Sequence, residues 1–345
     1  MVAPSVASRV VRWQRVHGRN SLPWQNTRDP YRVWLSEVML QQTQVVTAAA
    51  YFLRFVARLP TVASLAAASQ DEVLGLWSGL GYYSRARNLH RCASTIMREH
   101  AGVFPQTAAA LEQLPGIGRS TAAAISALCF GERVAILDAN VRRVVARLWA
   151  FDGDLAVAAN VQELWHLATD LLPRRNAERH MPRYTQGMMD LGATLCLARQ
   201  PACPVCPVAA SCQARALGTP ELFPVKTRRL NRSAESVWLL WATDATGRVW
   251  LQRRPSTGVW GGLYCLPWFE SRDALLATVS ARARRSTHEL EPVRHFLTHK
   301  DLCLHPVQLR MPTGSHVTAD GRWVTRTEWP NLGLPAPVRT LLLQA

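Results

Sequence analysis

Apolar residues recur every three or four positions along residues 1–213, and turns that contain proline or glycine interrupt the pattern. This period is typical of amphipathic helices, so we predict an almost entirely helical domain over this region. From residue 214 to 235 the periodicity is lost. Prolines and basic residues take its place, which predicts a basic linker.

The pattern after residue 235 favours strands as well as helices. Two apolar runs, residues 237–243 and 248–253, flank an Asp-Ala-Thr-Gly turn, which predicts a β-hairpin. The other elements that we expect are strands at 293–299 and 301–309 and helices at 271–285 and 337–344. Residues 236–345 are therefore predicted to form an α+β domain.

Charge narrows the choice of partners. The 345 residues are enough for two domains, and Lys+Arg 40 against Asp+Glu 24 gives a formal net charge of +16. Such an excess favours a polyanionic partner, with nucleic acid as the first choice. Arginine supplies nearly all of it, because the only lysines are Lys226 and Lys300.

The first sixteen residues lack the apolar core and the cleavage site of a signal peptide. No apolar run approaches the length of a membrane span, so we expect no membrane partner and a cytoplasmic protein. Its eight cysteines are then not expected to form disulfides. Four of them are clustered, which favours a metal site.

Residues 36–45 combine one carboxylate, Glu37, with three glutamines in an apolar segment. The period predicts a helix that continues to Ala50, with Glu37 near its start. Glu37 is either a capping-box partner or a functional carboxylate. The glutamines favour the second interpretation, because a solvated helix face carries Lys and Arg whereas glutamine hydrogen-bonds to base edges.

A Leu-Pro-Gly-x-Gly-Arg motif ends at Arg119, after a helix expected at 108–113. Gly116 and Gly118 let the backbone approach a ligand, and the free N–H groups of the next helix suit a phosphate. The motif favours a helix–hairpin–helix over an ordinary connection between helices. Downstream, Asp138 precedes a helix with two arginines; it is either an N-cap or the partner of Glu37.

Four cysteines with uneven spacing occur within seventeen residues: Cys196, Cys203, Cys206 and Cys212. Four thiolates in such a span can hold zinc or a 4Fe–4S cluster. Further upstream, Gly79 and Gly81 form a tight turn before Tyr82. An aromatic residue at such a turn is either a wedge between bases or a core residue.

Together, in this order, these motifs resemble the MutY-type adenine DNA glycosylases of the helix–hairpin–helix (endonuclease III) superfamily. The resemblance covers essentially the whole chain. It implies an all-α glycosylase domain at 1–213, with two lobes (26–134, and the N-terminus with 135–213) and a 4Fe–4S loop at 196–212. After the linker at 214–235, it implies a Nudix-like domain at 236–345 that recognises 8-oxoguanine.

The resemblance also implies an activity and its site. The protein would be a nucleoid-associated monomer of bacterial type, acting in base-excision repair on duplex DNA with adenine opposite 8-oxoguanine or guanine. Glu37 would protonate the adenine and Asp138 would stabilise the sugar cation. The other implied site residues are Ser120 and Asn140 beside the carboxylates, Gln42, Tyr82, Gly116, Gly118 and Arg119 on DNA, Trp24 and Gln186 in the base pocket, Thr298 and His299 at the lesion, and Cys196, Cys203, Cys206 and Cys212 on the cluster.

Three departures from the family pattern stand out. Ala139 replaces the glycine of the usual Asp-Gly-Asn, and Leu297-Thr298-His299 replaces Phe-Ser-His. The metal-binding box of Nudix hydrolases is missing from residues 269–291. We therefore expect the second domain to bind without pyrophosphatase activity.

The absence of a suitable lysine distinguishes this chain from the bifunctional glycosylases of the superfamily. Those enzymes attack the sugar with an amine and then break the DNA strand. In the endonuclease III branch that lysine occupies the position of Ser120, and no lysine precedes Lys226 here. Arginine stays protonated and is no substitute. We predict a monofunctional hydrolase. The alternatives are a bifunctional thymine-glycol glycosylase/lyase, an iron–sulfur redox sensor on DNA and an architectural DNA binder.

Overall fold

The computed structural model of the chain describes residues 5–227, 231–312, 315, 317, 318 and 320–344. The chain divides into two compact units. Unit 1 comprises Met1–Ala66 and Arg91–Arg228, and unit 2 comprises Ala67–His90 and Arg229–Ala345. This division differs from the expected domains, because residues 67–90 belong with the C-terminal sheet.

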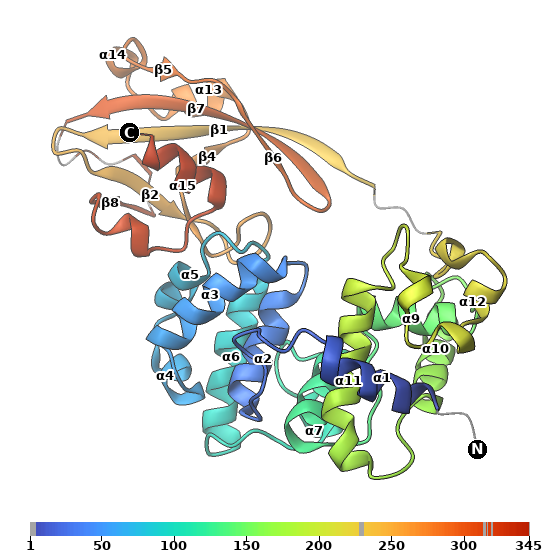
Figure 1. Cartoon of the computed structure of the whole chain (residues 1–345). Coiled ribbons are helices and arrows are strands. Elements are labelled where there is room, and N and C mark those ends of the chain that lie inside the picture. Colours follow the sequence, from blue (N-terminus) through green and yellow to red (C-terminus); the bar gives the residue numbers. More distant parts are fainter. Residues whose placement is uncertain (1–4, 228–230, 313–314, 316, 319, 345) are drawn as a thin grey trace. The chain divides into compact units, whose positions relative to one another are not determined.

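Unit 1 is helical, as the period of the sequence predicts (Figure 1). Its long helix α11 packs against α1, α9 and the π-helical turn η1, and their apolar faces form the core. The elements, with α6 running on from unit 2, are α1 (Val6–His17), α2 (Pro30–Leu40), α3 (Val45–Arg58), α4 (Val62–Ala67), α6 (Ser84–Glu99), α7 (Ala108–Leu111), α8 (Arg119–Ile125), η1 (Ser126–Phe130), α9 (Ala139–Leu148), α10 (Ala158–Asp170), α11 (Ala177–Thr194) and α12 (Gln213–Ala216).

The expectation of one helix across residues 36–50 is wrong, because the segment forms two helices. α2 ends at Leu40, Gln42 adopts the left-handed conformation with φ 56, and Gln44 caps the start of α3. Apolar residues keep the helical period across the break, so the pattern did not reveal it. The expectation that Glu37 lies near a helix start is also wrong. Glu37 lies in the C-terminal half of α2, because the Asp29 cap and Pro30 set the start of this helix earlier.

The expected linker at 214–235 is also shorter than predicted. α12 and the turn η4 (Pro220–Leu222) occupy its first part, and β1 (Ser233–Asp244) begins before its end. The N–H of Leu155 donates to the carbonyl of Val225 at 3.0 Å, which joins this segment to unit 1. Residues 228–230 of the expected linker lie outside the described residues.

Unit 2 is built on a mixed sheet with the order β3-β2-β1-β7-β5 (Figure 1). β1 runs parallel to β7 (Lys300–Met311), and the predicted hairpin of β1 with β2 is confirmed. The remaining elements are β2 (Val249–Arg253), β3 (Tyr264–Cys265), β4 (Trp268–Phe269), β5 (His288–Glu289), β6 (Val293–Phe296), β8 (Gly321–Val324), α5 (Gln70–Trp77), α13 (Arg272–Ala277), α14 (Ala281–Arg284), η5 (Trp329–Asn331) and α15 (Ala336–Leu343).

Both faces of β1 are apolar. Leu240 and Ala242 pack with Leu275 of α13, and the alternate residues Leu239 and Trp241 are buried toward the other face, where Figure 1 shows α15. The helix expected at 271–285 is two helices, because Ser280 caps a new one, α14. Among the described residues, no helix is long and apolar enough to cross a membrane.

Residues 67–90 join the sheet through specific contacts. The hydroxyls of Ser78 and Tyr83 donate to the carbonyl of Leu334 at 2.8 and 2.9 Å. Arg87 donates to the carbonyl of Gly261 at 2.6 Å. These bonds link the turn that carries Tyr82 to the C-terminal part of the chain, which no local pattern of the sequence predicts.

Candidate active site

Glu37 projects from α2 into a cavity of about 280 Å³. The cavity is also lined by Trp24 and Gln186, the two residues predicted for a base pocket. Trp24 is 7% exposed and packs edge-on against Phe52 with ring centroids 5.4 Å apart. An aromatic wall and several polar groups around one carboxylate make this cavity the candidate active site.

The environment of Glu37 suits a proton donor. Burial, and after it the nearby Asp138 carboxylate, raises the pKa of Glu37 to about 7. A carboxyl group with this pKa is protonated in a large fraction of molecules at neutral pH. The role expected of Glu37 from the sequence, protonation of adenine, needs a raised pKa of this kind.

Asp138 is held by the first turn of α9. Its carboxylate accepts a hydrogen bond from the N–H of Val141 at 2.7 Å, so it is an N-cap as well as a neighbour of Glu37. Burial is the largest influence on Asp138 and raises its pKa above the ordinary value. The backbone N–H groups of Val141 and Asn140 and the charge of Arg143 favour the ionised form and offset part of this rise.

Ser120 connects the hairpin to the residue that precedes Asp138. α7 and α8 flank the turn at Gly116, whose φ of 77 is left-handed, and Gly118 precedes α8. The hydroxyl of Ser120 accepts from the N–H of Leu137 at 3.2 Å, one residue before Asp138. A Cβ added at Gly118 would meet nothing within 4 Å, so this backbone is open to a ligand.

Two further predicted residues have defined partners. The guanidinium of Arg119 lies 4.0 Å from the ring centroid of Trp165 and donates to Gln162 at 3.0 Å. The side-chain carbonyl of Asn140 accepts from Arg143 at 3.0 Å. Arg143 also donates to the carbonyl of Cys196, so one guanidinium joins the first turn of α9 to the cysteine loop.

The four cysteines of the predicted cluster loop line one small apolar cavity. Burial raises the pKa of Cys206 to about 11, and the three other cysteines raise it as well, which shows their proximity. Arg147 donates to the sulfur of Cys196 at 3.3 Å. Among the described residues, no group of three or more His, Cys, Asp or Glu residues has the arrangement of a metal-ion site. A 4Fe–4S cluster is held by four thiolates, and all four cysteines line this cavity, so the residue types fit such a group.

The two residues predicted to enter the DNA stack have unusual backbones. Gln42 and Tyr82 are exposed and adopt left-handed conformations, with φ 56 and 48. Such conformations cost energy in residues other than glycine and concentrate at functional sites. Within unit 2, the hydroxyls of Tyr82 and Thr298 form a hydrogen bond. Thr298 and His299 are exposed in the turn between β6 and β7.

Several cavity residues were not predicted from the sequence. Gln25, Arg28 and Arg183 line the cavity with Glu37. Asp190 is fully buried behind it and bonds to Gln186, four residues earlier on α11. A single aspartate in the otherwise apolar stretch 187–192 was a signal, but its partner Arg19 is 171 positions away.

Comparison with known proteins identifies the class first. Residues 35–167 match the HhH-GPD superfamily of base excision DNA repair proteins, and residues 237–344 match the NUDIX domain. A thermostable thymine-DNA glycosylase of known structure superposes with a TM-score of 0.54 at 27% identity, over 61% of this chain and 95% of that chain. The chain therefore contains the helical fold of base-excision glycosylases.

Two curated relatives narrow the family. The adenine DNA glycosylase of Buchnera aphidicola subsp. Acyrthosiphon pisum (strain APS) is 34% identical over 96% of this chain and 95% of its own length. The adenine DNA glycosylase of Homo sapiens is 34% identical over 90% of this chain and 68% of its own length. The chain belongs to the adenine DNA glycosylase family, which confirms the resemblance noted in the sequence.

Proposed function

We propose that this protein removes adenine from duplex DNA where adenine stands opposite 8-oxoguanine or guanine. The observation that carries the proposal is the pKa of Glu37, about 7, in a cavity shared with Trp24 and Gln186. A glycosidic nitrogen leaves badly as an anion, so the purine must first be protonated. Glu37 is the group whose environment provides a proton at neutral pH.

The chain's own residues divide the reaction between them. Glu37 protonates N7 of the extruded adenine, and the sugar becomes oxocarbenium-like as the bond breaks. Asp138, whose ionised form is favoured against burial by the N–H groups at the start of α9 and by Arg143, stabilises or captures this cation. Ser120 and Asn140 assist, the first through its bond to Leu137 and the second through Arg143. Water then completes hydrolysis at the sugar.

Binding to DNA precedes this chemistry. Extrusion of a base costs a few kcal/mol, which contacts to the backbone and the stack must offset. The hairpin with Gly116, Gly118 and Arg119 binds phosphate, and Gln42 and Tyr82 occupy the disturbed stack. Support comes from the open backbone at Gly118 and from the exposed, left-handed conformations of Gln42 and Tyr82.

The cysteine loop holds a 4Fe–4S cluster in this proposal, through Cys196, Cys203, Cys206 and Cys212. The cluster, when bound, supplies structural order to a loop that meets DNA. Support comes from the single cavity that all four residues line and from the arginines that bond to Cys196. A Cys203→Ser variant is expected to lose iron and DNA affinity together, and iron analysis of both proteins tests this.

The Nudix-like domain distinguishes 8-oxoguanine from guanine, with Thr298 and His299 facing the lesion and no pyrophosphatase activity. We place the start of its sheet at Ser233, where β1 begins, rather than at the expected residue 236. The exposed turn between β6 and β7 and the bond from Thr298 to Tyr82 support this role. The protein acts as a monomer on chromosomal DNA, in the nucleoid of a bacterial cytoplasm.

One assay tests the function against its alternatives. The purified protein is mixed in excess with duplexes that contain adenine:8-oxoguanine or thymine glycol, with and without alkali, and with borohydride. We expect base release from the first duplex only, strand breakage only after alkali, and no trapped adduct, because no lysine precedes Lys226. Nicking of the thymine-glycol duplex would establish the bifunctional alternative. DNA affinity that follows oxidation state, without base release, would establish the redox sensor.

A further inference from the structure

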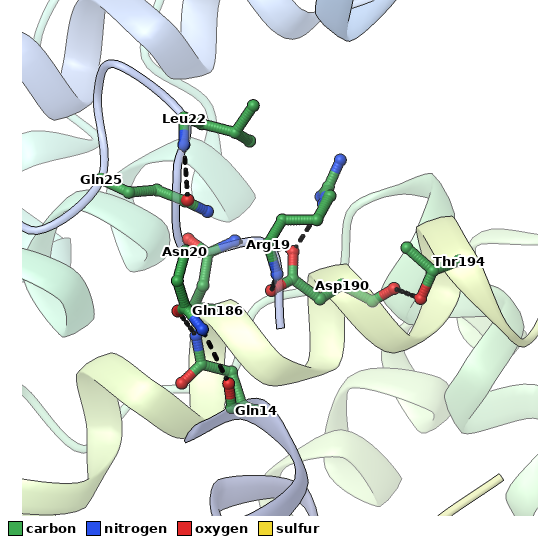
Figure 2. A network of polar contacts seen from close by, with 8 residues as sticks. All are labelled: Gln14, Arg19, Asn20, Leu22, Gln25, Gln186, Asp190 and Thr194. Carbon is green, nitrogen blue, oxygen red and sulfur yellow. Dashed lines mark hydrogen bonds and ion pairs between the residues drawn. The ribbon is translucent and has the colours of Figure 1, made fainter. Parts of the chain in front are cut away.

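A network of polar side chains lies behind the cavity and centres on Asp190 of α11 (Figure 2). The Asp190 side chain has no exposed surface. Its carboxylate accepts from the backbone N–H of Arg19 at 3.0 Å, from Nε of Arg19 at 2.8 Å and from Nε2 of Gln186 at 3.0 Å. A buried charge requires partners of this kind, and here the partners belong to the two segments that supply the cavity wall.

Asp190 determines which way the amide of Gln186 is turned. A carboxylate paired with arginine can only accept hydrogen bonds, so the amide must offer its NH₂ group to Asp190. The carbonyl oxygen Oε1 of Gln186 then faces away from Asp190. Gln186 lines the cavity with Glu37, so it offers the cavity an acceptor.

Gln25 is turned the opposite way for the same kind of reason. Its Oε1 accepts from the backbone N–H of Leu22 at 3.1 Å, and a backbone N–H can only donate (Figure 2). Its NH₂ group is buried and has no hydrogen-bond partner among the described residues. Gln25 lines the same cavity, so this cavity has an unsatisfied donor from Gln25 as well as the acceptor of Gln186.

We propose that Asp190 is a positioning residue that gives the cavity its preference for adenine, an inference that rests on the proposed function. With Gln186 as acceptor and Gln25 as donor, the cavity complements the edge of a base that carries an amino group next to an unprotonated ring nitrogen. Adenine has N6 and N1 in this arrangement, and its N7 remains for Glu37. Guanine and hypoxanthine carry an oxygen and an N–H at the same two positions, so both contacts become mismatched.

Hypoxanthine is the sharpest probe, because it reverses this edge and keeps N7. Single-turnover rates are measured with full-length protein on duplexes with adenine or hypoxanthine opposite 8-oxoguanine. Asp190→Asn keeps the side-chain size but offers both a donor and an acceptor, so the Gln186 amide is no longer held in one orientation. We expect the adenine-to-hypoxanthine rate ratio to fall about tenfold, which corresponds to about 1.4 kcal/mol.

Two further variants keep the test decisive. Gln25→Met removes the donor without touching Asp190 and should lower the same ratio, even if Asp190→Asn does not fold. Thr194→Val is the matched control, because the hydroxyl of Thr194 donates to the backbone carbonyl of Asp190, at 2.8 Å, and not to its carboxylate. The control should keep the wild-type ratio.

The outcomes separate the two levels of the proposal. A wild-type protein that releases neither base overturns the proposed function and the positioning role together. An active wild type whose Asp190→Asn and Gln25→Met variants slow both bases equally overturns the positioning role alone. Equal slowing is what a purely structural contribution of Asp190 produces.

Discussion

The cavity around Glu37 and the turn between β6 and β7 differ in what holds their side chains. Around Glu37, burial and a neighbouring carboxylate change the acidity of the group, and buried partners such as Asp190 orient the walls. In the turn, Thr298 and His299 are exposed, and the adjacent Phe296 is 64% exposed. Acid catalysis needs a shielded environment before the substrate arrives, whereas a recognition surface is completed only by its ligand.

The largest effect should come from removing the proton donor. Glu37→Gln keeps the shape of the side chain and cannot supply an acidic proton, so we expect base release to fall by about 10²–10⁴-fold. Affinity for the duplex should change little, because the hairpin and the wedge residues are untouched. Single-turnover excision and equilibrium binding measure the two quantities. Unchanged excision would show that the shielded cavity is not the catalytic centre.

The pH dependence of excision also tests the cavity around Glu37. Glu37 must be protonated to act, and its pKa is about 7, so the active fraction is lost as pH rises through this value. We expect the excision rate to fall roughly tenfold per pH unit above about pH 7. The residual rate of Glu37→Gln should lack this slope. A wild-type rate that is flat from pH 7 to 9 contradicts the assigned donor.

A smaller effect is expected where α11 packs closely against the first turn of α9. A Cβ added at Gly192 of α11 would lie 2.7 Å from Cβ of Asn140 and 2.8 Å from its backbone carbonyl. Gly192→Ala should therefore displace the first turn of α9, lower stability by about 1–3 kcal/mol and slow excision. Gly118→Ala is the control for folding, since its added Cβ meets nothing within 4 Å. Urea denaturation measures the stability of both variants. Equal stabilities of Gly192→Ala and Gly118→Ala would contradict the predicted clash.

The exposed turn should show the smallest effect. Thr298→Val removes the hydroxyl that bonds to Tyr82 and keeps the shape of the side chain. We expect the preference for adenine opposite 8-oxoguanine over guanine to fall about fivefold, the value of one hydrogen bond of about 1 kcal/mol. Stability should be unchanged, because the site is exposed. If stability falls instead and discrimination is kept, the turn has a structural role.

Some expectations from the sequence hold because their causes are local. Asp138 caps α9 through a bond to a residue three positions away. The glycines at 116 and 118 place the hairpin between α7 and α8. Periodicity also found the hairpin of β1 and β2, yet it missed the break at Gln42, since the apolar spacing continues through it.

The sequence by itself determined the family, the order of the motifs and the residue types that chemistry requires, because short-range caps, turns and spacings encode them. Only the tertiary structure decided the acidity of Glu37, the orientation of the Gln186 amide and the attachment of residues 67–90 to the sheet. Each of these depends on burial or on a partner distant in the chain, as Arg19 is from Asp190. Local patterns carry no record of such partners, since the free energy of a buried group is set by whatever surrounds it.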